Sequence, residues 1–366
     1  MTVHVLAACS PGEVRVAAMR DGFMLDYAVW RPGRPDGVGD VLRGRAGTRV
    51  PAMAGVFVAL PGMNGFLPDS EGGAALSDGM AVGVRITRAA QGGKGPRLAA
   101  AGPVSPGPPA LLSRGPTAVE RLAALHPDAS VLADDPALVA QLRPVLGDRI
   151  GVARVLDDAL LSGIDVLAVP DLSLPGGARA SIHPTPALVA IDMDAGAATG
   201  ERRAKPAAQM AANLAALPEI ARHIRLRNLS GAILVDVAGM SIRRRPALAP
   251  AFLAALDGDP LHPRFLGFTA LGLAEIMRPR VHPPLHELLA GPHAAGLAAL
   301  RDIMAAAAAE PAVTFALRCA PAVAAAMHGD PVALPDLARR TGRPLMIHPD
   351  PALPAGACII ERSARA

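Results

Sequence analysis

Cysteine is scarce in this chain, and long apolar runs are missing. The three cysteines among the 366 residues are Cys9, Cys319 and Cys358, and their positions match no metal-ligand spacing. Thiols this few and scattered indicate a reducing compartment, so we expect the cytoplasm. No window reaches about eighteen uninterrupted apolar residues, and we therefore expect no membrane span. No basic segment and no long apolar core precede Cys9, so we assign it to an N-terminal loop or strand.

Aromatic residues are also few, at 2 %, whereas apolar residues reach 51 % and charged ones 19 %. Such a balance is typical of a globular protein, and the length allows two or three domains. The net charge of +4 is compatible with a polyanionic partner. Two arginine clusters, 243–245 and Arg278 with Arg280, form either a solvated basic face or phosphate contacts. Their closeness in sequence to the acidic residues described next favours phosphate modestly.

Two short apolar runs, 187–194 and 232–236, each end in carboxylates. The residues between them predict a helix with one buried face, because apolar side chains recur there at three- and four-residue spacing (Met210, Leu214, Leu217, Ile220 and Ile224). Pro218 is expected to divide that helix. A strand–helix–strand unit folds as a right-handed crossover with parallel strands. Asp192 and Asp236 should then meet at the carboxyl edge of a sheet.

Two carboxylates at such an edge suit Mg²⁺, which takes one or two of them and keeps waters for substrate phosphates. A single aspartate there would more simply end a strand or cap a helix. For the pair, metal binding and a structural role are about equally well supported by the residues alone.

The rest of the chain divides by pattern. Residues 13–19 and 23–30 predict a β-hairpin, and 39–100 predict a small barrel of short strands with glycine turns. The Pro- and Gly-rich residues 103–109 predict a linker. From Thr117 onward the pattern is α/β, ending in an alanine-rich helix at 297–309 and a strand–helix–helix–strand segment at 313–361.

The barrel segment carries two of the seven phenylalanines, Phe57 and Phe66, within ten positions, and Lys94 in a glycine-rich loop. Exposed aromatic faces stack nucleic-acid bases, and a nearby cation contacts phosphate. The alternative, which composition favours slightly, places both phenylalanines in the core.

Taken together, these motifs resemble the ribonuclease E/G family. Residues 13–22 (EVRVAAMRDG) are similar to its opening hairpin, and 39–45 (GDVLRGR) to the start of its RNA-binding barrel. Phe57, Phe66 and the segment 93–98 (GKGPRL) are similar to that barrel's aromatic positions and exit. Three further segments resemble the blocks around the catalytic aspartates and the arginine motif that follows them: 187–200 (ALVAIDMDAGAATG), 213–236 and 272–280 (GLAEIMRPR).

The resemblance implies an α/β (α+β multidomain) protein. We expect an RNase H-like subdomain (1–36 and 117–178), split by an inserted OB-fold RNA-binding barrel (37–100) with a Pro/Gly linker (101–116). A DNase I-like catalytic subdomain (179–295) and a small C-terminal α/β domain (296–366) should follow.

It also implies an endoribonuclease that acts on single-stranded RNA. Mg²⁺ held by Asp192 and Asp236, with Asp194 as a further oxygen ligand, would activate the water that attacks the phosphodiester, leaving a 5′-phosphate and a 3′-hydroxyl. The RNA contacts would come from three barrel residues and three arginines: Phe57, Phe66, Lys94, Arg264, Arg278 and Arg280.

Several departures from the family pattern matter. No segment resembles its sensor of the RNA 5′ end, and no Cys-Pro-x-Cys zinc element follows the arginine motif, where 291–293 read Gly-Pro-His. Asp194 stands where the family commonly has Asn, Gly239 replaces an acidic residue, and His262 aligns near an arginine that Arg264 could replace.

We therefore expect a compact, cytoplasmic endoribonuclease, with no membrane partner and with any homo-oligomer not joined through zinc. The alternative is an RNA-binding protein with weak or no cleavage. Both metal aspartates favour the enzyme, whereas Asp194 and Gly239 favour the alternative. His183 and His223 are expected to be surface or packing residues.

Overall fold

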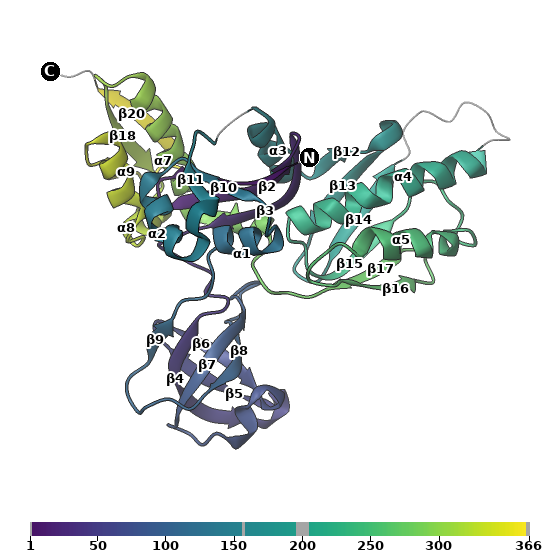
Figure 1. Ribbon diagram of the computed structural model, residues 1–366, viewed down its shortest axis with the longest axis horizontal. Coiled ribbons are helices and arrows are strands. Elements are labelled where there is room, and N and C mark those ends of the chain that lie inside the picture. Colours follow the sequence, from purple (N-terminus) through teal and green to yellow (C-terminus); the bar gives the residue numbers. More distant parts are fainter. Residues whose placement is uncertain (1, 156–157, 195–204, 364–366) are drawn as a thin grey trace. The chain divides into compact units, whose positions relative to one another are not determined.

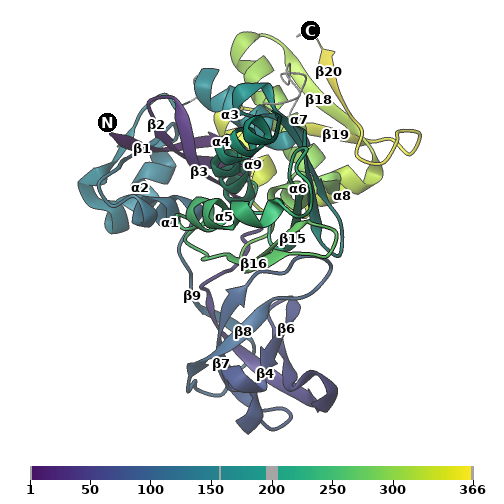
Figure 2. The same cartoon turned by 90° about the vertical axis from the view of Figure 1, so that its right-hand side faces the viewer.

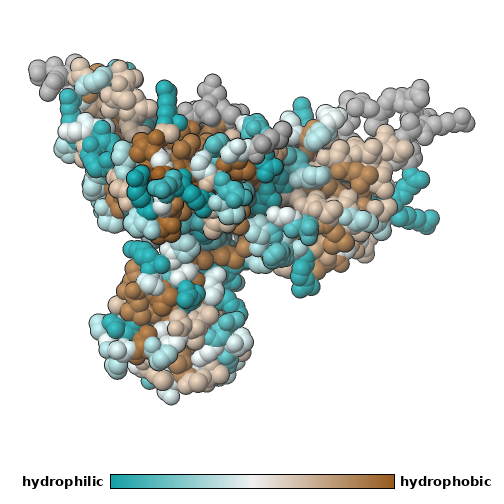
Figure 3. Space-filling model, viewed as in Figure 1, coloured by the Kyte–Doolittle hydropathy of each residue, from teal (hydrophilic) through white to brown (hydrophobic). Residues whose placement is uncertain are grey.

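The computed structural model describes residues 2–155, 158–194 and 205–363. The chain forms two compact units, one of residues 1–156 with 287–366 and the other of residues 157–286 (Figure 1). Both units mix helices and strands, which confirms the expected mixed α/β class. Among the described residues, no helix combines the length and apolar character needed to cross a membrane. On the face drawn in Figure 3, hydrophilic and hydrophobic residues are intermixed.

The first sheet of the larger unit has the strand order β11-β10-β1-β2-β3. Its strands are β1 (Val3–Ser10), β2 (Glu13–Arg20), β3 (Phe23–Trp30), β10 (Ser130–Ala133) and β11 (Ile150–Val152). The predicted hairpin is confirmed as β2 and β3, and its turn puts Asp21 and Gly22 at positive φ, a conformation typical of an Asp-Gly turn. Cys9 lies in β1. Helices α1 (Ala118–Leu125) and α2 (Pro136–Leu146) pack on this sheet and share its core.

A closed five-stranded barrel is inserted between β3 and α1 (Figure 2). It consists of β4 (Val41–Val50), β5 (Gly55–Leu60), β6 (Met63–Pro68), β7 (Ala81–Arg88) and β8 (Arg97–Gly102), and pairing of β4 with β5 closes it. Alternate residues such as Val56, Val58 and Leu98 fill the interior. A further strand, β9 (Ala110–Ser113), pairs with β4. The expected linker over 101–116 is therefore too long, since β8 includes 101–102 and β9 includes 110–113, which leaves 103–109 as the connection between these strands.

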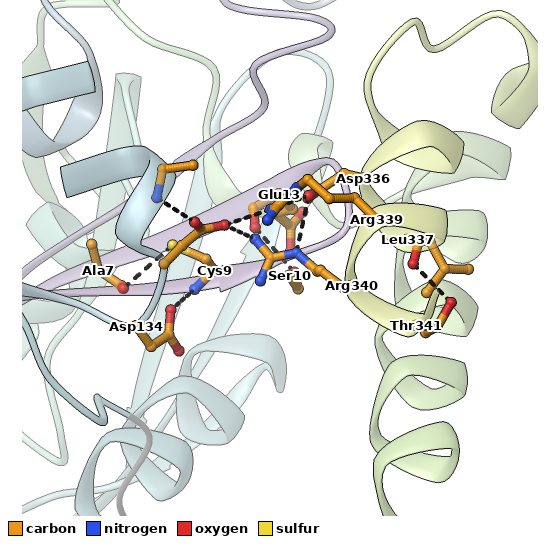
Figure 4. A network of polar contacts seen from close by, with 12 residues as sticks. Ala7, Cys9, Ser10, Glu13, Asp134, Asp336, Leu337, Arg339, Arg340 and Thr341 are labelled. Carbon is orange, nitrogen blue, oxygen red and sulfur yellow. Dashed lines mark hydrogen bonds and ion pairs between the residues drawn. The ribbon is translucent and has the colours of Figure 1, made fainter. Parts of the chain in front are cut away.

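The C-terminal part of the larger unit is a small α/β layer. Its elements are α7 (Gly291–Ala309), β18 (Thr314–Cys319), α8 (Pro321–His328), α9 (Ala333–Thr341), β19 (Met346–Pro349) and β20 (Cys358–Ser363). The expected strand, two helices and strand are present, and β19 is an additional strand parallel to β18. Asp135, at the start of α2, accepts hydrogen bonds from Arg339 and Arg340 of α9, and these ion pairs attach the layer to α2. Figure 4 labels the two arginines.

The smaller unit is a six-stranded sheet of order β12-β13-β14-β15-β17-β16. Its strands are β12 (Asp171–Ser173), β13 (Arg179–Pro184), β14 (Val189–Asp194), β15 (Gly231–Asp236), β16 (Arg264–Phe268) and β17 (Ala274–Arg278). Its helices are α3 (Asp158–Ala168), α4 (Lys205–Leu226) and α5 (Ala249–Leu256), and the boundary between the two units falls within the short α6 (Leu285–Leu288). We expected residues 117–178 to belong to the RNase H-like subdomain. Elements α3 and β12, which lie within that range, instead belong to the smaller unit.

Helix α4 connects the two aspartate-bearing strands and packs on one face of their sheet. The predicted division at Pro218 is wrong, because α4 continues through it. Pro218 and Leu214 both lie on the exposed side, so water can satisfy the Leu214 carbonyl that loses its helical donor. Leu214 itself is 44 % exposed, whereas its neighbour Asn213 is fully buried. At this turn Asn213, rather than the expected Leu214, lies on the buried face of the helix.

Candidate metal centre and RNA-contacting surfaces

Strands β14 and β15 are parallel, and Asp192 lies directly opposite Asp236 in their register. The crossover expected from the sequence is thus confirmed. Ile191 and Val235, the preceding residues, are buried against α4, so alternation along each strand directs both aspartates to the opposite face of the sheet. That face is open, and two carboxylates project side by side from it.

The same row continues across the sheet. Asp171 on β12 is the register partner of Ser181 on β13, which is in turn the partner of Asp192. In the next row Asp194 lies opposite Arg179. These residues and Ser173 line a cavity of about 380 Å³ beside the paired aspartates. Sequence reasoning missed Asp171, Arg179 and Ser181, although Arg179, Ser181 and His183 alternate with buried residues as the polar side of a strand.

Arg245 holds the carboxylate of Asp236. Its Nη1 donates to Asp236 Oδ1 at 2.7 Å and to the Gly272 carbonyl at 2.9 Å, and its Nε donates to the Met240 carbonyl at 3.0 Å. Arg245 is 13 % exposed and Asp236 46 % exposed. The arginine therefore fixes the orientation of a carboxylate that stays open to solvent. Of the 243–245 cluster, only Arg243 and Arg244 remain exposed for phosphate contacts.

The donor set fits an oxygen-preferring cation with few protein ligands. Within the described residues, no three His, Cys, Asp or Glu side chains come together as a metal-binding group. Two adjacent carboxylates on an open face match Mg²⁺, which takes one or two carboxylates and retains water, better than Ca²⁺ or Zn²⁺, whose sites have more protein ligands. Asp194 lies one row farther along β14 and next to Arg179, so its part as a ligand stays a prediction.

Asn213 of α4 supports the loop after β15. Its side chain accepts a hydrogen bond from the Ala238 amide at 3.0 Å and donates to the Ala238 carbonyl at 2.9 Å. The following residue, Gly239, has φ +63°, and a Cβ there would lie 2.9 Å from the Gln209 side chain. A side chain at position 239 would thus be strained, which accounts for the glycine that replaces an acidic residue of the family pattern.

The three arginines expected to contact RNA differ in their surroundings. Arg278 is only 3 % exposed and donates to Asp259 at 2.7 Å and to the Asn228 side chain at 2.7 Å. Its assignment to RNA binding is wrong, because its guanidinium is buried with polar partners of its own. Arg280 and Arg264 are exposed, and Arg264 lies on the open face of the sheet beside Met277.

Histidine 223 is a packing residue, as expected. It is 2 % exposed on α4 and pairs with Glu219 at 3.2 Å. Burial lowers the pKa of His223, and the cations of Arg227 and Arg222 lower it further, against the raising effect of Glu219. The ring is therefore neutral near pH 7.

The barrel presents its two phenylalanines together on its outer surface. Phe57 and Phe66 are register partners on β5 and β6, and their rings meet edge-to-face with centroids 5.4 Å apart. Phe57 is 42 % exposed, which excludes a core position for it. Gly55 makes room beneath the Phe66 ring, since a Cβ at Gly55 would lie 2.5 Å from it. Lys94 is exposed in the loop before β8.

Comparison with known proteins finds one family that matches part of this chain. The statistical model described as "Ribonuclease E/G family" matches residues 159–281, the segment that contains both aspartates. Ribonuclease E of Nostoc sp. is 38 % identical over 120 residues, which are 32 % of this chain and 17 % of that protein. Residues 159–281 of this chain therefore match the ribonuclease E/G family.

Two further ribonucleases are similar to this chain. Ribonuclease G of Haemophilus influenzae is 30 % identical over 159 residues, 43 % of this chain and 30 % of that protein. Ribonuclease G of Escherichia coli K12 is 32 % identical over 119 residues, 32 % of this chain and 24 % of that protein. The matched part thus spans less than a third of each of these ribonucleases. The family match does not reach the barrel, so the role of the barrel rests on its own geometry.

Proposed function

We propose that this chain is a Mg²⁺-dependent endoribonuclease that cleaves single-stranded RNA in RNA processing or decay. The observation that carries the proposal is the register pairing of Asp192 with Asp236 on the open face of the smaller unit. The family match of residues 159–281 supports the reaction class, since the similar proteins carry the names ribonuclease E and ribonuclease G.

Asp192 and Asp236 would hold the ion, with Asp194 beside them. When bound there, Mg²⁺ lowers the pKa of its water and offsets the charge that grows on the phosphoryl oxygens. Arg245 keeps one Asp236 oxygen oriented and leaves the other accessible. Arg179 and Ser181, which line the adjoining cavity, can donate to a phosphate or a ribose hydroxyl of the RNA. Cleavage leaves a 5′-phosphate and a 3′-hydroxyl.

Binding of the single strand falls to the barrel. Phe57 and Phe66 offer ring faces for bases, and Lys94 supplies a cation for the backbone. Arg97, the register partner of Phe66, is exposed on the same side and adds a second cation. Stacking and charge together favour single strands, because paired bases do not offer their faces.

A second candidate is an RNA-binding protein with weak or no cleavage. The ion pair between Arg245 and Asp236 favours it, since the arginine competes with a metal for the carboxylate. We place either protein in the cytoplasm, and we propose no zinc-linked dimer.

The two candidates are distinguished by removing the ligand charge. We expect Asp192→Asn and Asp236→Asn each to lower Mg²⁺-dependent cleavage of a fluorescent single-stranded RNA by at least about 100-fold, because metal activation of water is lost. RNA affinity should change little. EDTA should abolish cleavage by the unaltered protein, and excess Mg²⁺ should restore it.

Asp257→Asn is the matched control, because Asp257 is an exposed aspartate of the same unit outside this row. Full activity in either site variant would refute the assignment. No Mg²⁺-dependent cleavage in the unaltered protein, with normal RNA binding, would favour the second candidate.

A further inference from the structure

A cavity of about 400 Å³ in the larger unit has arginines as its cationic walls. Arg15 comes from β2, Arg31 from the residue after β3, and Arg301 from α7. The remaining wall comes from Leu289, from the first two turns of α7 and from Ala355–Gly356 before β20. None of these residues belongs to the metal centre or to the aromatic surface of the barrel.

Glu13 organises the three arginines from the floor of the cavity. Its side chain is 2 % exposed, and Oε1 accepts from Arg15 Nε at 3.0 Å and from Arg301 Nη1 at 3.1 Å. Oε2 accepts from Nε and Nη2 of Arg31 at 3.0 and 2.9 Å. Burial alone would raise the pKa of Glu13, but Arg31, Arg15 and Arg301 lower it below its ordinary value. Glu13 is therefore an anion, and three cations face it.

One carboxylate does not require three guanidinium groups. Arg31 alone provides two charge-assisted hydrogen bonds to it, and the other two arginines leave the cavity with an excess of two positive charges. These side chains are 10 % (Arg31), 17 % (Arg15) and 29 % (Arg301) exposed, so water screens their repulsion only in part. Such an arrangement is costly unless an anion balances it.

Donors remain for that anion. Among the described residues, no hydrogen-bond acceptor contacts Nη1 or Nη2 of Arg15, or Nε or Nη2 of Arg301. The positive end of α7 adds to them: Gly291, Pro292 and Ala294 of its first turn line the cavity. That turn has no acidic residue, and no side chain caps it. Guanidinium forks and an uncapped helix start are both suited to phosphate oxygens.

We propose that this cavity binds a small phosphate-bearing anion, either inorganic phosphate or a nucleoside monophosphate. A phosphate dianion matches the excess of two positive charges. The volume falls in the range of small-ligand sites, and the depth of Glu13 and Arg31 favours a small molecule over a polynucleotide backbone. The site is independent of the cleavage proposed above.

Binding to the whole chain is measured by titration calorimetry at fixed ionic strength, with inorganic phosphate, adenosine monophosphate and a 5′-hydroxyl RNA oligonucleotide as separate probes. We expect one phosphate-binding site per chain. Arg301→Gln should weaken binding about tenfold or more, because it removes charge-assisted hydrogen bonds. Arg20→Gln is the control, since Arg20 is an exposed arginine at the end of β2 outside the cavity, and it should bind as the unaltered protein does.

Binding of phosphate but not of the nucleotide would assign the free anion, and tighter binding of the nucleotide would assign the monoester. Circular dichroism shows whether Arg301→Gln is folded, and Arg15→Gln gives the same test if it is not. No saturable binding of either small probe, or equal affinity in the folded cavity variants, would overturn the proposal. If the RNA oligonucleotide binds while neither small probe does, and Arg301→Gln weakens that binding, the proposal would also be overturned and the arginines would be assigned to a polynucleotide.

Discussion

Arg245 affects Asp236 in two opposing ways. Its hydrogen bond orients the carboxylate, and its positive charge weakens the attraction of that carboxylate for a metal. Two backbone carbonyls, those of Met240 and Gly272, keep the guanidinium in place, so it does not depend on a bound ion for its position. We regard Arg245 as a positioning residue for the proposed reaction.

Replacing this arginine separates the two effects. We expect Arg245→Gln to lower kcat about 10- to 100-fold, as loss of a group that orients a metal ligand does, while the half-saturating Mg²⁺ concentration falls because a competing cation is gone. Mg²⁺ titrations of RNA cleavage measure both. The exposed Arg243→Gln should change neither. An unchanged kcat for Arg245→Gln would limit the residue to a structural role.

Glu219 on α4 provides a prediction for pH. Burial raises its pKa, but hydrogen bonds from Arg222 and His223 outweigh burial and lower the pKa to about 2. Because the folded pKa lies below the ordinary value of 4.5, this carboxylate stabilises the fold above about pH 4.5, and the contribution is lost as pH falls from there towards 2. Glu219→Gln should lower the free energy of unfolding of the smaller unit by about 1–3 kcal/mol at pH 7 and by roughly half of that or less near pH 3.

Urea unfolding at the two pH values tests this expectation. Asp257→Asn, at an exposed position, should stay within about 0.5 kcal/mol of the unaltered protein at pH 7. The same deficit for Glu219→Gln at both pH values would show that lost packing, rather than charge, is responsible.

At the scale of elements, strands β5 and β6 place one exposed and one half-buried ring together. We expect Phe57→Ala and Phe66→Ala each to weaken single-stranded RNA binding by about 1–3 kcal/mol, because a stacking face is lost. Lys94→Ala should flatten the salt dependence of binding by about one ion. Fluorescence anisotropy over a range of salt concentrations measures these effects.

Phe23→Ala is the matched control, since Phe23 is 49 % exposed but lies on β3, outside the barrel. Normal RNA affinity in the folded Phe57→Ala and Phe66→Ala proteins would show that this face of the barrel does not bind RNA.

Patterns within one element predicted the elements that position the site. Short β-branched apolar runs predicted β14 and β15, and the helix between them predicted their parallel pairing and the meeting of Asp192 with Asp236. Strands β9 and β19 were missed because each has only four residues, beside prolines, and owes its place to pairing with a longer strand. At Asn213, hydrogen bonds to the loop after β15 outweigh the apolar pattern of the helix.

The missed site residues all depend on tertiary partners. Asp171 and Arg179 join the aspartate rows only through pairing of β12 and β13, and no local pattern specifies that register. Arg278 looked available for phosphate, but its buried partners Asp259 and Asn228 come from distant turns. The sequence thus shows which side chains carry charge, but it does not show which charged or polar group each of them pairs with in the fold.

For the whole molecule, we expect cleavage to be independent of the 5′ end of the RNA. Gripping a terminal phosphate takes an arginine fork and hydroxyl or backbone donors in one pocket. Only residues 103–109 separate β8 from β9, and this segment is short and poor in side-chain donors. Cleavage rates on 5′-monophosphorylated and 5′-hydroxyl RNAs of one sequence should agree within about twofold. A large preference for the monophosphate would contradict this expectation and direct attention to the arginine-lined cavity.

The pairing of β9 with β4 also bears on how the chain finds its fold. The first sheet is completed only when β10 returns to β1, where His4 and Ser130 pair across 126 residues. Val41 and Ser113 already lie side by side once the barrel has formed. An early-folding barrel therefore more than halves the length of free chain between β1 and β10. The entropic cost of closing that loop falls by about 0.7 kcal/mol as a result. The inserted barrel thereby favours refolding in which it forms first and the sheet around it closes afterwards.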